Sequence, residues 1–165
     1  MTKLSAVSDS GPIMHLSEIG ALKILGMFNI VIPEEVLSET ANIHTNAKVL
    51  RLDQKHKDLA RLLTLTDSIQ LGEAEAISLA LQQGVRLFFT DDLDARSVAG
   101  KYGLKAHGTV GILVKAFRKG ILSESEVVSF LRLLRSKSSL FITNELVEWC
   151  IRKIRQHSSS KKRRK

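Results

Sequence analysis

The feature that most constrains the fold of this chain is the alternation of short β-like runs with helical patterns through its first 120 residues. Apolar runs near residues 4–8, 29–32 and 86–90 each give way to a segment with helical periodicity, and a smaller strand is expected around residues 104–106. Strands that alternate with helices indicate parallel βαβ units with right-handed crossovers. The sequence therefore predicts an α/β fold built on a parallel sheet.

The helices of this region are expected between those strands. Pro33 suits a first helical turn because its missing N–H is not needed there, and Glu34 and Glu35 complement the positive end of the helix dipole. Residues 64–66 are expected as a short strand. The predicted helices cover residues 12–25, a short segment from Pro33, and residues 45–63, 71–83, 93–101 and 109–119.

From about residue 120 onward the pattern indicates helices only. Residues 123–126, Ser-Glu-Ser-Glu, are typical of a capped helix start, and this helix is expected to run to about residue 135, with a second over about 143–156. Some 30 residues could hardly fold alone. We expect one domain over residues 1–157, with a core at about 4–120 and a helical addendum at about 121–157.

The net charge of +8 is concentrated at the end of the sequence, where five consecutive cations contribute +5. Residues 158–165 have no apolar side chain to bury, so they are expected to form a disordered basic tail. Such a tail can add salt-sensitive affinity for RNA or DNA, although an incidental solubilising tail fits equally well. The cations concerned are Lys161, Lys162, Arg163, Arg164 and Lys165.

Other compositional features indicate a cytoplasmic protein. The apolar residues recur periodically and never form a run of 18 or more, and the first residues show no apolar leader with a cleavage site, so neither a membrane span nor membrane partners are expected. Cys150 is the single cysteine and cannot form an intramolecular disulfide. We expect it to be a packed, reduced thiol.

Acidic residues stand where a βα protein would gather them, at Asp9, Glu39, Glu73 and the pair Asp91–Asp92. Asp9 and Asp91 each follow a predicted strand, and the ligand crevice of an open α/β sheet lies beyond the carboxyl ends of its strands. Local explanations stay open for each acid, because Asp9 fits a turn and Asp91 or Asp92 fits a helix cap.

Glu73 has the strongest local argument among these acids. In the predicted helix over residues 71–83 it shares a face with Ala76, Ile77 and Ala80, so a carboxylate heads an otherwise small and apolar stripe. A first-turn glutamate favoured by the helix dipole is the alternative. Glu75 faces a more mixed surface and is expected to be solvated.

Taken together, these carboxylates favour a site for a hard divalent cation. Oxygen-only clusters suit Mg²⁺ or Mn²⁺, which can activate a water for in-line phosphodiester hydrolysis. The sequence has no Gly-rich phosphate loop, no G-x-S-x-G elbow and no H-E-x-x-H helix, and its five histidines lack ligand spacing.

At five stretches the chain resembles the PIN-domain family, in particular the small prokaryotic PIN proteins related to VapC-type toxins. The resemblance covers about residues 4–120, in the order of the family's motifs. The stretches are residues 7–12 (VSDSGP), 31–39 (VIPEEVLSE), 71–77 (LGEAEAI), 87–92 (LFFTDD), and 103–104 (GL) with 108–113 (GTVGIL).

The resemblance implies a three-layer α/β/α fold around a parallel sheet of four or five strands, with the C-terminal helices added. It also implies a ribonuclease that hydrolyses RNA with metal-activated water at Asp9, Glu39, Glu73 and Asp92, the residues expected to bind Mg²⁺ or Mn²⁺. Ser10 is the expected supporting hydroxyl. Two departures matter: Glu73 replaces the aspartate of many members, and Asp91 is an alternative fourth acid.

Substrate and partners follow from the same resemblance. Arg96 and Lys101 are candidates for contact with the RNA backbone, although both also fit ordinary solvated charges on a helix. Recognition is expected to depend on phosphate and shape because aromatic residues make up only 5% of the chain. As a toxin of a toxin–antitoxin pair the protein would form a homodimer and bind a small antitoxin. The alternatives are a non-catalytic nucleic-acid-binding or scaffolding protein, and a phosphohydrolase acting on small esters.

Overall fold

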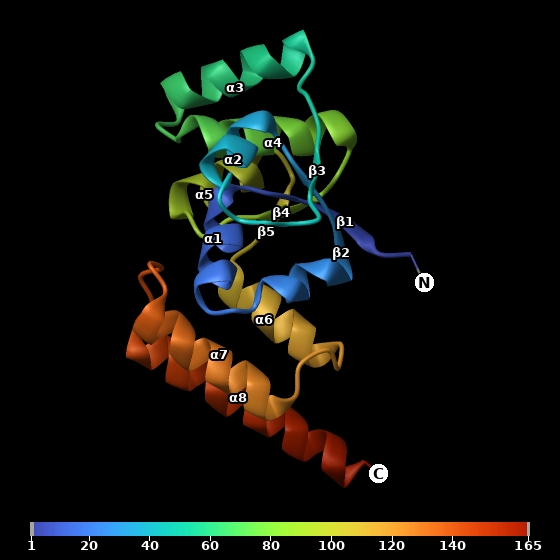
Figure 1. Ribbon diagram of the computed structural model, residues 1–165, viewed down its shortest axis with the longest axis vertical. Helices are drawn as coiled ribbons and strands as arrows, with labels where there is room; N and C mark the ends of the chain where they lie inside the picture. Colours follow the sequence, from blue (N-terminus) through green and yellow to red (C-terminus); the bar gives the residue numbers. More distant parts are fainter. Residues whose placement is uncertain (1, 165) are drawn as a thin grey trace.

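The predicted strands assemble into one parallel sheet in a computed structural model that describes residues 2–164 (Figure 1). Its order is β3-β2-β1-β4-β5, and every neighbouring pair is parallel. The five-stranded α/β fold with C-terminal helices confirms the expected fold class. The strands are β1 (Leu4–Ser8), β2 (Phe28–Ile32), β3 (Lys48–Val49), β4 (Leu87–Phe89) and β5 (Lys105–His107).

The sheet has its topological switch point between β1 and β4. The chain moves outward from β1 through β2 to β3 on one side, and then returns to place β4 and β5 on the other. Ser8 pairs with Phe89, so the residues that follow these strands, Asp9 and Thr90, emerge side by side. Ligand sites of open α/β sheets lie at such a point.

Helices cover both faces of the sheet (Figure 1). On one face lie α1 (Ser10–Glu18), the 3₁₀ helix η1 (Leu22–Met27) and α6 (Thr109–Arg118). On the other lie α2 (Glu34–Glu39), α4 (Leu71–Gln83) and α5 (Leu93–Lys101), with α3 (Gln54–Thr66) outermost. Val7 and Phe88 of the sheet, Ile77 of α4 and Leu113 of α6 are fully buried, so the core lies between the sheet and these helices.

The C-terminal helices form a hairpin of α7 (Glu124–Lys137) and α8 (Asn144–Arg163), which packs against α6 and α1. Leu131 and Ile151 are buried between the helices and the rest of the core. The predicted helix start is confirmed, because the Ser123 hydroxyl accepts from the Glu126 N–H and the Glu126 carboxylate accepts from the Ser123 N–H. Cys150 is a buried free thiol, and burial raises its pKa.

Three predicted boundaries in the first half are wrong. The helix expected over residues 12–25 ends at Glu18, because Gly20 adopts a left-handed φ of 72° and the chain restarts as η1. The helix expected over 45–63 contains β3 and starts only at Gln54, where Asp53 caps it. Residues 64–66 are the end of α3 rather than a strand.

The expected disordered tail is also not what the structure shows. Helix α8 continues through Arg163, so residues 158–163 form a helical arm, while Lys165 lies outside the described residues. The hydroxyls of Ser159 and Ser160 donate to the carbonyls of Arg155 and Gln156, one turn earlier, both at 3.0 Å. Extending a helix that is already packed needs no new nucleation, so apolar residues are not required for it.

Among residues 2–164 no helix has the combination of length and hydropathy that crossing a bilayer requires.

Candidate active site

Asp9 lies at the centre of the carboxyl edge of the sheet. It directly follows β1 and caps α1, and its Oδ1 accepts the Gly11 N–H at 3.1 Å. Only 3% of the residue is exposed. Burial, together with the neighbouring carboxylates of Glu73 and Asp91, raises the pKa of Asp9 to about 8, although hydrogen bonds from Thr90 and Gly11 act in the opposite direction. Without a cation, Asp9 is therefore largely protonated at neutral pH.

Thr90 connects Asp9 with Asp92 across the switch point. The Thr90 hydroxyl is fully buried, hydrogen-bonds the Asp9 carboxyl group, and accepts the Asp92 N–H at 3.1 Å. Asp92 then caps α5, with its Oδ1 accepting the Ala95 N–H at 2.8 Å. The Asp92 side chain is exposed, so the cap leaves its other oxygen open to solvent.

Glu73 approaches from the first turn of α4. Its Oε2 accepts the Gln70 N–H at 2.9 Å in a capping box, so Glu73 also has a local structural role in the first turn of the helix. The side chain is half-buried, and its pKa is raised by burial and by the neighbouring carboxylates of Asp92, Glu39 and Asp94. The Glu73 carboxylate thus caps the N-terminus of α4 and is also part of an acidic cluster.

Glu39, the last residue of α2, lies over the start of α4. A Cβ atom built on Gly72 would come within 2.9 Å of the Glu39 Cδ and Oε2 atoms and closer still to Oε1. The missing side chain at position 72 therefore provides the space that the Glu39 carboxylate occupies beside Glu73. The sequence alone assigns Gly72 no role, because nothing local to Leu71-Gly72-Glu73 points to residue 39.

The four predicted acids converge through Glu73. The charge of Glu73 contributes to the raised pKa of Asp9, and the charges of Asp92 and Glu39 contribute to the raised pKa of Glu73. Within residues 2–164, however, no set of three or more His, Cys, Asp or Glu side chains has the arrangement of a finished metal site. The structure brings the acids into one neighbourhood without placing them in coordination geometry.

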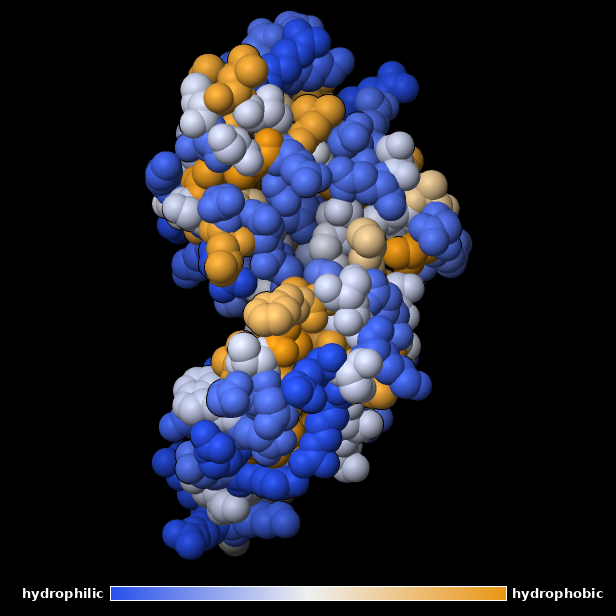
Figure 2. Space-filling model, turned by 90° about the vertical axis from the view of Figure 1, so that its left-hand side faces the viewer, coloured by the Kyte–Doolittle hydropathy of each residue, from blue (hydrophilic) through white to orange (hydrophobic). Residues whose placement is uncertain are grey.

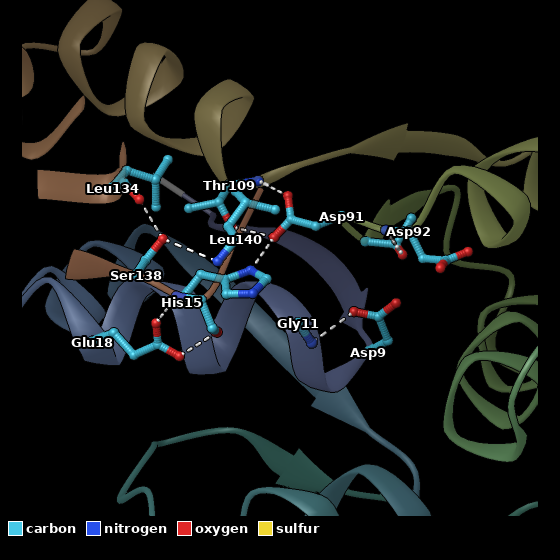
Figure 3. Close-up of polar contacts among 12 residues, drawn as sticks. Asp9, Gly11, His15, Glu18, Asp91, Asp92, Thr109, Leu134, Ser138 and Leu140 are labelled. Atoms are coloured by element: carbon cyan, nitrogen blue, oxygen red, sulfur yellow. Dashed lines mark hydrogen bonds and ion pairs between the residues drawn. The ribbon is translucent and has the colours of Figure 1, made fainter. Parts of the chain in front are cut away.

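Asp91 turns away from this cluster, as Figure 3 shows. Its Oδ1 accepts the Thr109 N–H at 2.7 Å, and its Oδ2 accepts the Thr109 hydroxyl at 2.5 Å and His15 Nδ1 at 2.7 Å. Both oxygens are therefore engaged by the start of α6 and by α1. Neither His15 nor Thr109 was expected here, since no sequence pattern links positions 15, 91 and 109.

The remaining predicted residues are placed as follows. Ser10 is half-buried beside Asp9 at the start of α1. Arg96 is exposed on α5, and its Nη2 lies 3.5 Å from the Thr90 carbonyl oxygen, next to the cluster. Lys101 is at the opposite end of α5, where its Nζ is 3.3 Å from Asp67 Oδ1.

Two further predictions concern groups outside the cluster. Lys161, Lys162 and Arg163 lie on the helical arm of α8 and Arg164 caps its C-terminus, rather than forming a disordered tail. Glu75 is not simply solvated, because its Oε2 accepts the Glu35 N–H at 3.2 Å at the start of α2 and burial raises its pKa.

The donor set fits a hard divalent cation. The cluster supplies only carboxylate oxygens, which are the ligands that Mg²⁺ and Mn²⁺ prefer. The raised pKa values of Asp9 and Glu73 show that the carboxylates repel one another and are poorly solvated, a cost that a bound cation would relieve.

Comparison with known proteins identifies one family. A family model described as a PIN domain, DUF3368, matches residues 5–156, which is most of the chain. The match includes all four candidate acids and most of the α7–α8 hairpin. No curated protein matches the chain.

Proposed function

Because the chain belongs to the DUF3368 family of PIN domains, a fold whose members are generally nucleases, we propose that it is a ribonuclease dependent on Mg²⁺ or Mn²⁺. One observation carries the proposal: Asp9, Glu39, Glu73 and Asp92 come from four separate elements to one edge of the sheet, where their charges disturb one another. A protein gains no stability from such a cluster, so its presence favours a functional role.

In this proposal the four acids hold the cation, and Asp9 and Glu73 are its principal ligands. The bound cation supplies Lewis-acid chemistry that favours attack of water on a phosphodiester. Asp9 gives up its proton when it becomes a ligand. Thr90 holds Asp9 and the Asp92 backbone in register, and the capping box fixes Glu73.

Asp91 acts as a positioning residue in the same proposal. Because both of its oxygens are engaged by Thr109 and His15, it holds α1 and α6 beside the site and leaves Asp92 as the fourth acid. A toxin–antitoxin role, with a homodimer and a small antitoxin, stays a prediction that rests on the family resemblance alone.

The deciding experiment is an RNA-cleavage assay with Mg²⁺, Mn²⁺ or EDTA. It compares the wild type with Asp9→Asn and Glu73→Gln, and with Asp58→Asn on the outer helix α3 as the control for loss of an exposed acid. We expect cleavage that depends on the cation, is lost in the first two variants, and is retained in the control.

Two outcomes contradict this proposal. Cation-dependent cleavage that survives both Asp9→Asn and Glu73→Gln would mean that the site lies elsewhere or that another nuclease is present. A folded wild-type protein that binds neither cation by calorimetry and cuts no RNA would instead support the non-catalytic nucleic-acid-binding alternative.

A further inference from the structure

A cavity of about 320 Å³ lies at the carboxyl end of β5, outside the acidic cluster. Its walls come from α5, from the turn between β5 and α6, and from the loop that joins α7 to α8. We refer to it as the β5-end pocket. The residues that matter for its chemistry are Arg96, His107, Leu140, Phe141 and Leu146.

The β5-end pocket shares a wall with the candidate active site. Asp91 lines the pocket, and its charge also raises the pKa of Asp9. His107 pairs with Phe89 in the sheet, and the Phe89 carbonyl accepts the Asp9 N–H, so the pocket lies on the same sheet edge as the acids.

Phe141 provides an exposed aromatic face at the mouth of this pocket. It is 90% exposed, the highest value among the large apolar residues of the described chain, and Leu146 beside it is 44% exposed. Figure 2 shows an apolar patch where the helical hairpin meets the α/β body. An aromatic side chain left in water is a favourable surface for a stacking partner.

The loop that carries Phe141 is tied to the body of the protein. The Ser139 hydroxyl donates to Glu18 Oε1 of α1 at 2.7 Å, and the Ser139 N–H donates to the other oxygen of the same carboxylate. The Leu140 N–H donates to the Ser138 hydroxyl at 3.2 Å. Phe141 is thus presented by a loop with fixed neighbours, which lowers the ordering cost of binding.

The opposite side of the pocket is polar and carries the Arg96 guanidinium, which donates to the Thr90 carbonyl at 3.5 Å. Among residues 2–164, no carboxylate lies within 4.0 Å of the Arg96 guanidinium. Gly108 makes room for it, since a Cβ there would lie 2.9 Å from Arg96 Nη2. Burial and the charges of Lys115 and Arg96 lower the pKa of His107, so its imidazole is neutral and offers one donor and one acceptor.

We propose that the β5-end pocket binds one unstacked nucleotide of a single-stranded RNA, with its base on Phe141 and an adjoining phosphate at Arg96. The inference rests on the proposed ribonuclease function and adds a base-binding subsite to it. An aromatic face, a guanidinium with no carboxylate within 4.0 Å among residues 2–164, and a neutral imidazole match the base and phosphate of one nucleotide. A base inside a duplex cannot reach the pocket, so single strands are preferred over duplexes.

The test uses the full chain in EDTA, where cleavage is suppressed, and labelled single-stranded RNA octamers that each have one abasic position. We expect one abasic position to weaken binding by the wild type about tenfold to a hundredfold, the range of one base–aromatic stack. Phe141→Ala should bind the intact RNA about tenfold to a hundredfold more weakly than the wild type does. It should bind the intact and the abasic RNA with equal affinity, because the stacking partner of the base is already missing. Phe141→Trp should restore the sensitivity to the abasic position.

Leu65→Ala is the matched control, because Leu65 is 82% exposed on the distant helix α3. It should leave every affinity unchanged. Since both side chains are exposed, neither substitution should alter the melting temperature.

Three results would overturn the inference. The first is an equal abasic penalty in the wild type and in Phe141→Ala. The second is a change of oligomeric mass in Phe141→Ala with unchanged RNA affinity, which would make the patch a protein interface. The third is the absence of any RNA binding. If RNA is cleaved in a cation-dependent way but the abasic penalty does not depend on Phe141, the proposed function stands and the nucleotide-binding pocket is rejected. If the abasic penalty depends on Phe141 but no RNA is cleaved, the pocket stands and the ribonuclease function is rejected.

Discussion

Asp9 is a carboxyl group whose charged form is disfavoured by its own surroundings. Its pKa in the folded protein is about 8, against 3.8 for an aspartate in water. Between these values the folded state binds more protons than the unfolded state, so in the absence of a cation the folded state loses stability as pH rises through this window. This loss of stability comes from burying the charged carboxylate, so an uncharged amide at the same position would not cause it.

We therefore expect Asp9→Asn to stabilise the cation-free protein at high pH. In EDTA the variant should match the wild type within about 1 kcal/mol at pH 4 and be more stable by roughly 2–5 kcal/mol at pH 8. Urea unfolding at several pH values measures the difference. Added Mg²⁺ should shrink it, because the cation binds the folded wild type. A difference that does not change with pH would show that Asp9 titrates normally.

Asp91 and Asp92 are adjacent in sequence but have separate roles. Asn caps a helix about as well as Asp, so Asp92→Asn should change stability by less than about 0.5 kcal/mol while lowering RNA cleavage at least about tenfold. In Asp91→Asn, an amide with only one acceptor oxygen would face the three donors from His15 and Thr109 that the carboxylate now accepts. The substitution should therefore lower the free energy of unfolding by about 1–3 kcal/mol.

Thermal unfolding and cleavage rates measured on the same samples separate the two residues. The expected pattern is a lowered melting temperature for Asp91→Asn alone, and cation-dependent cleavage that is at least about tenfold slower in Asp92→Asn. The reverse pattern would make Asp91 the fourth acid and Asp92 only a cap.

At the scale of elements, the contact between α2 and α4 depends on a missing side chain. Gly72→Ala removes a helical glycine and should add about 0.5–1 kcal/mol of stability, because Ala is the better helix former. The new Cβ would also occupy the space of the Glu39 carboxylate. We therefore expect a protein that is at least as stable as the wild type and has weaker cation-dependent cleavage.

Gly100→Ala is the matched control for this substitution. Gly100 also lies in a helix, and a Cβ there would meet nothing within 4 Å. It should give the same gain in stability with unchanged activity. If Gly72→Ala is as active as Gly100→Ala, then the position of Glu39 does not matter for the reaction.

The elements that the sequence predicted best are those whose periodicity is long and uninterrupted. Helices α4 and α5 have the predicted bounds, 71–83 and 93–101, because each begins at a capping residue and stays helical until a glycine or a turn. Strand β3 was missed because it has only two residues, both exposed, and so has no alternation to detect. The basic arm was missed because helix extension depends on the packed helix before it rather than on its own composition.

The candidate site shows the same division between local and distant information. The acids themselves could be predicted because each stands at the end of a strand or helix. Their partners could not, since the contacts of His15 with Asp91 and of Glu39 with Gly72 join residues far apart in the chain. The sheet order, with β4 returning beside β1, brings Asp91 to His15, and the packing of α4 against α2 brings Gly72 to Glu39.

Over the whole molecule, the net positive charge is concentrated in the C-terminal segment. Residues 124–165 contain 11 Lys and Arg and four Glu, so the hairpin segment holds seven of the eight net positive charges. The remainder, with 14 Lys and Arg and 13 Asp and Glu, is nearly neutral and contains the acidic cluster. An RNA is thus attracted chiefly by the hairpin segment, while the acidic cluster repels its phosphates until a cation is bound.

Truncation after His157 tests whether the helical arm contributes to this attraction. The last buried residue of α8 is Ile154, and His157 keeps its edge-to-face contact with Phe117, so the free energy of unfolding should change by less than about 0.5 kcal/mol. The slope of log K against log salt for single-stranded RNA should become shallower by about 0.7 for each phosphate that the arm neutralises in the wild type, up to about 3.5 for five cations.

A second variant separates the charge of the arm from its length. Replacing Lys161, Lys162, Arg163 and Arg164 with glutamine removes four cations and keeps a good helix former at each position. Because phosphate binding depends on charge, this variant should reproduce most of the change in slope that truncation causes. Fluorescence anisotropy over a range of salt concentrations measures both. Slopes equal to that of the wild type would leave the arm without a part in RNA binding, and the attraction would then have to come from the cations of α7 and of the first turns of α8.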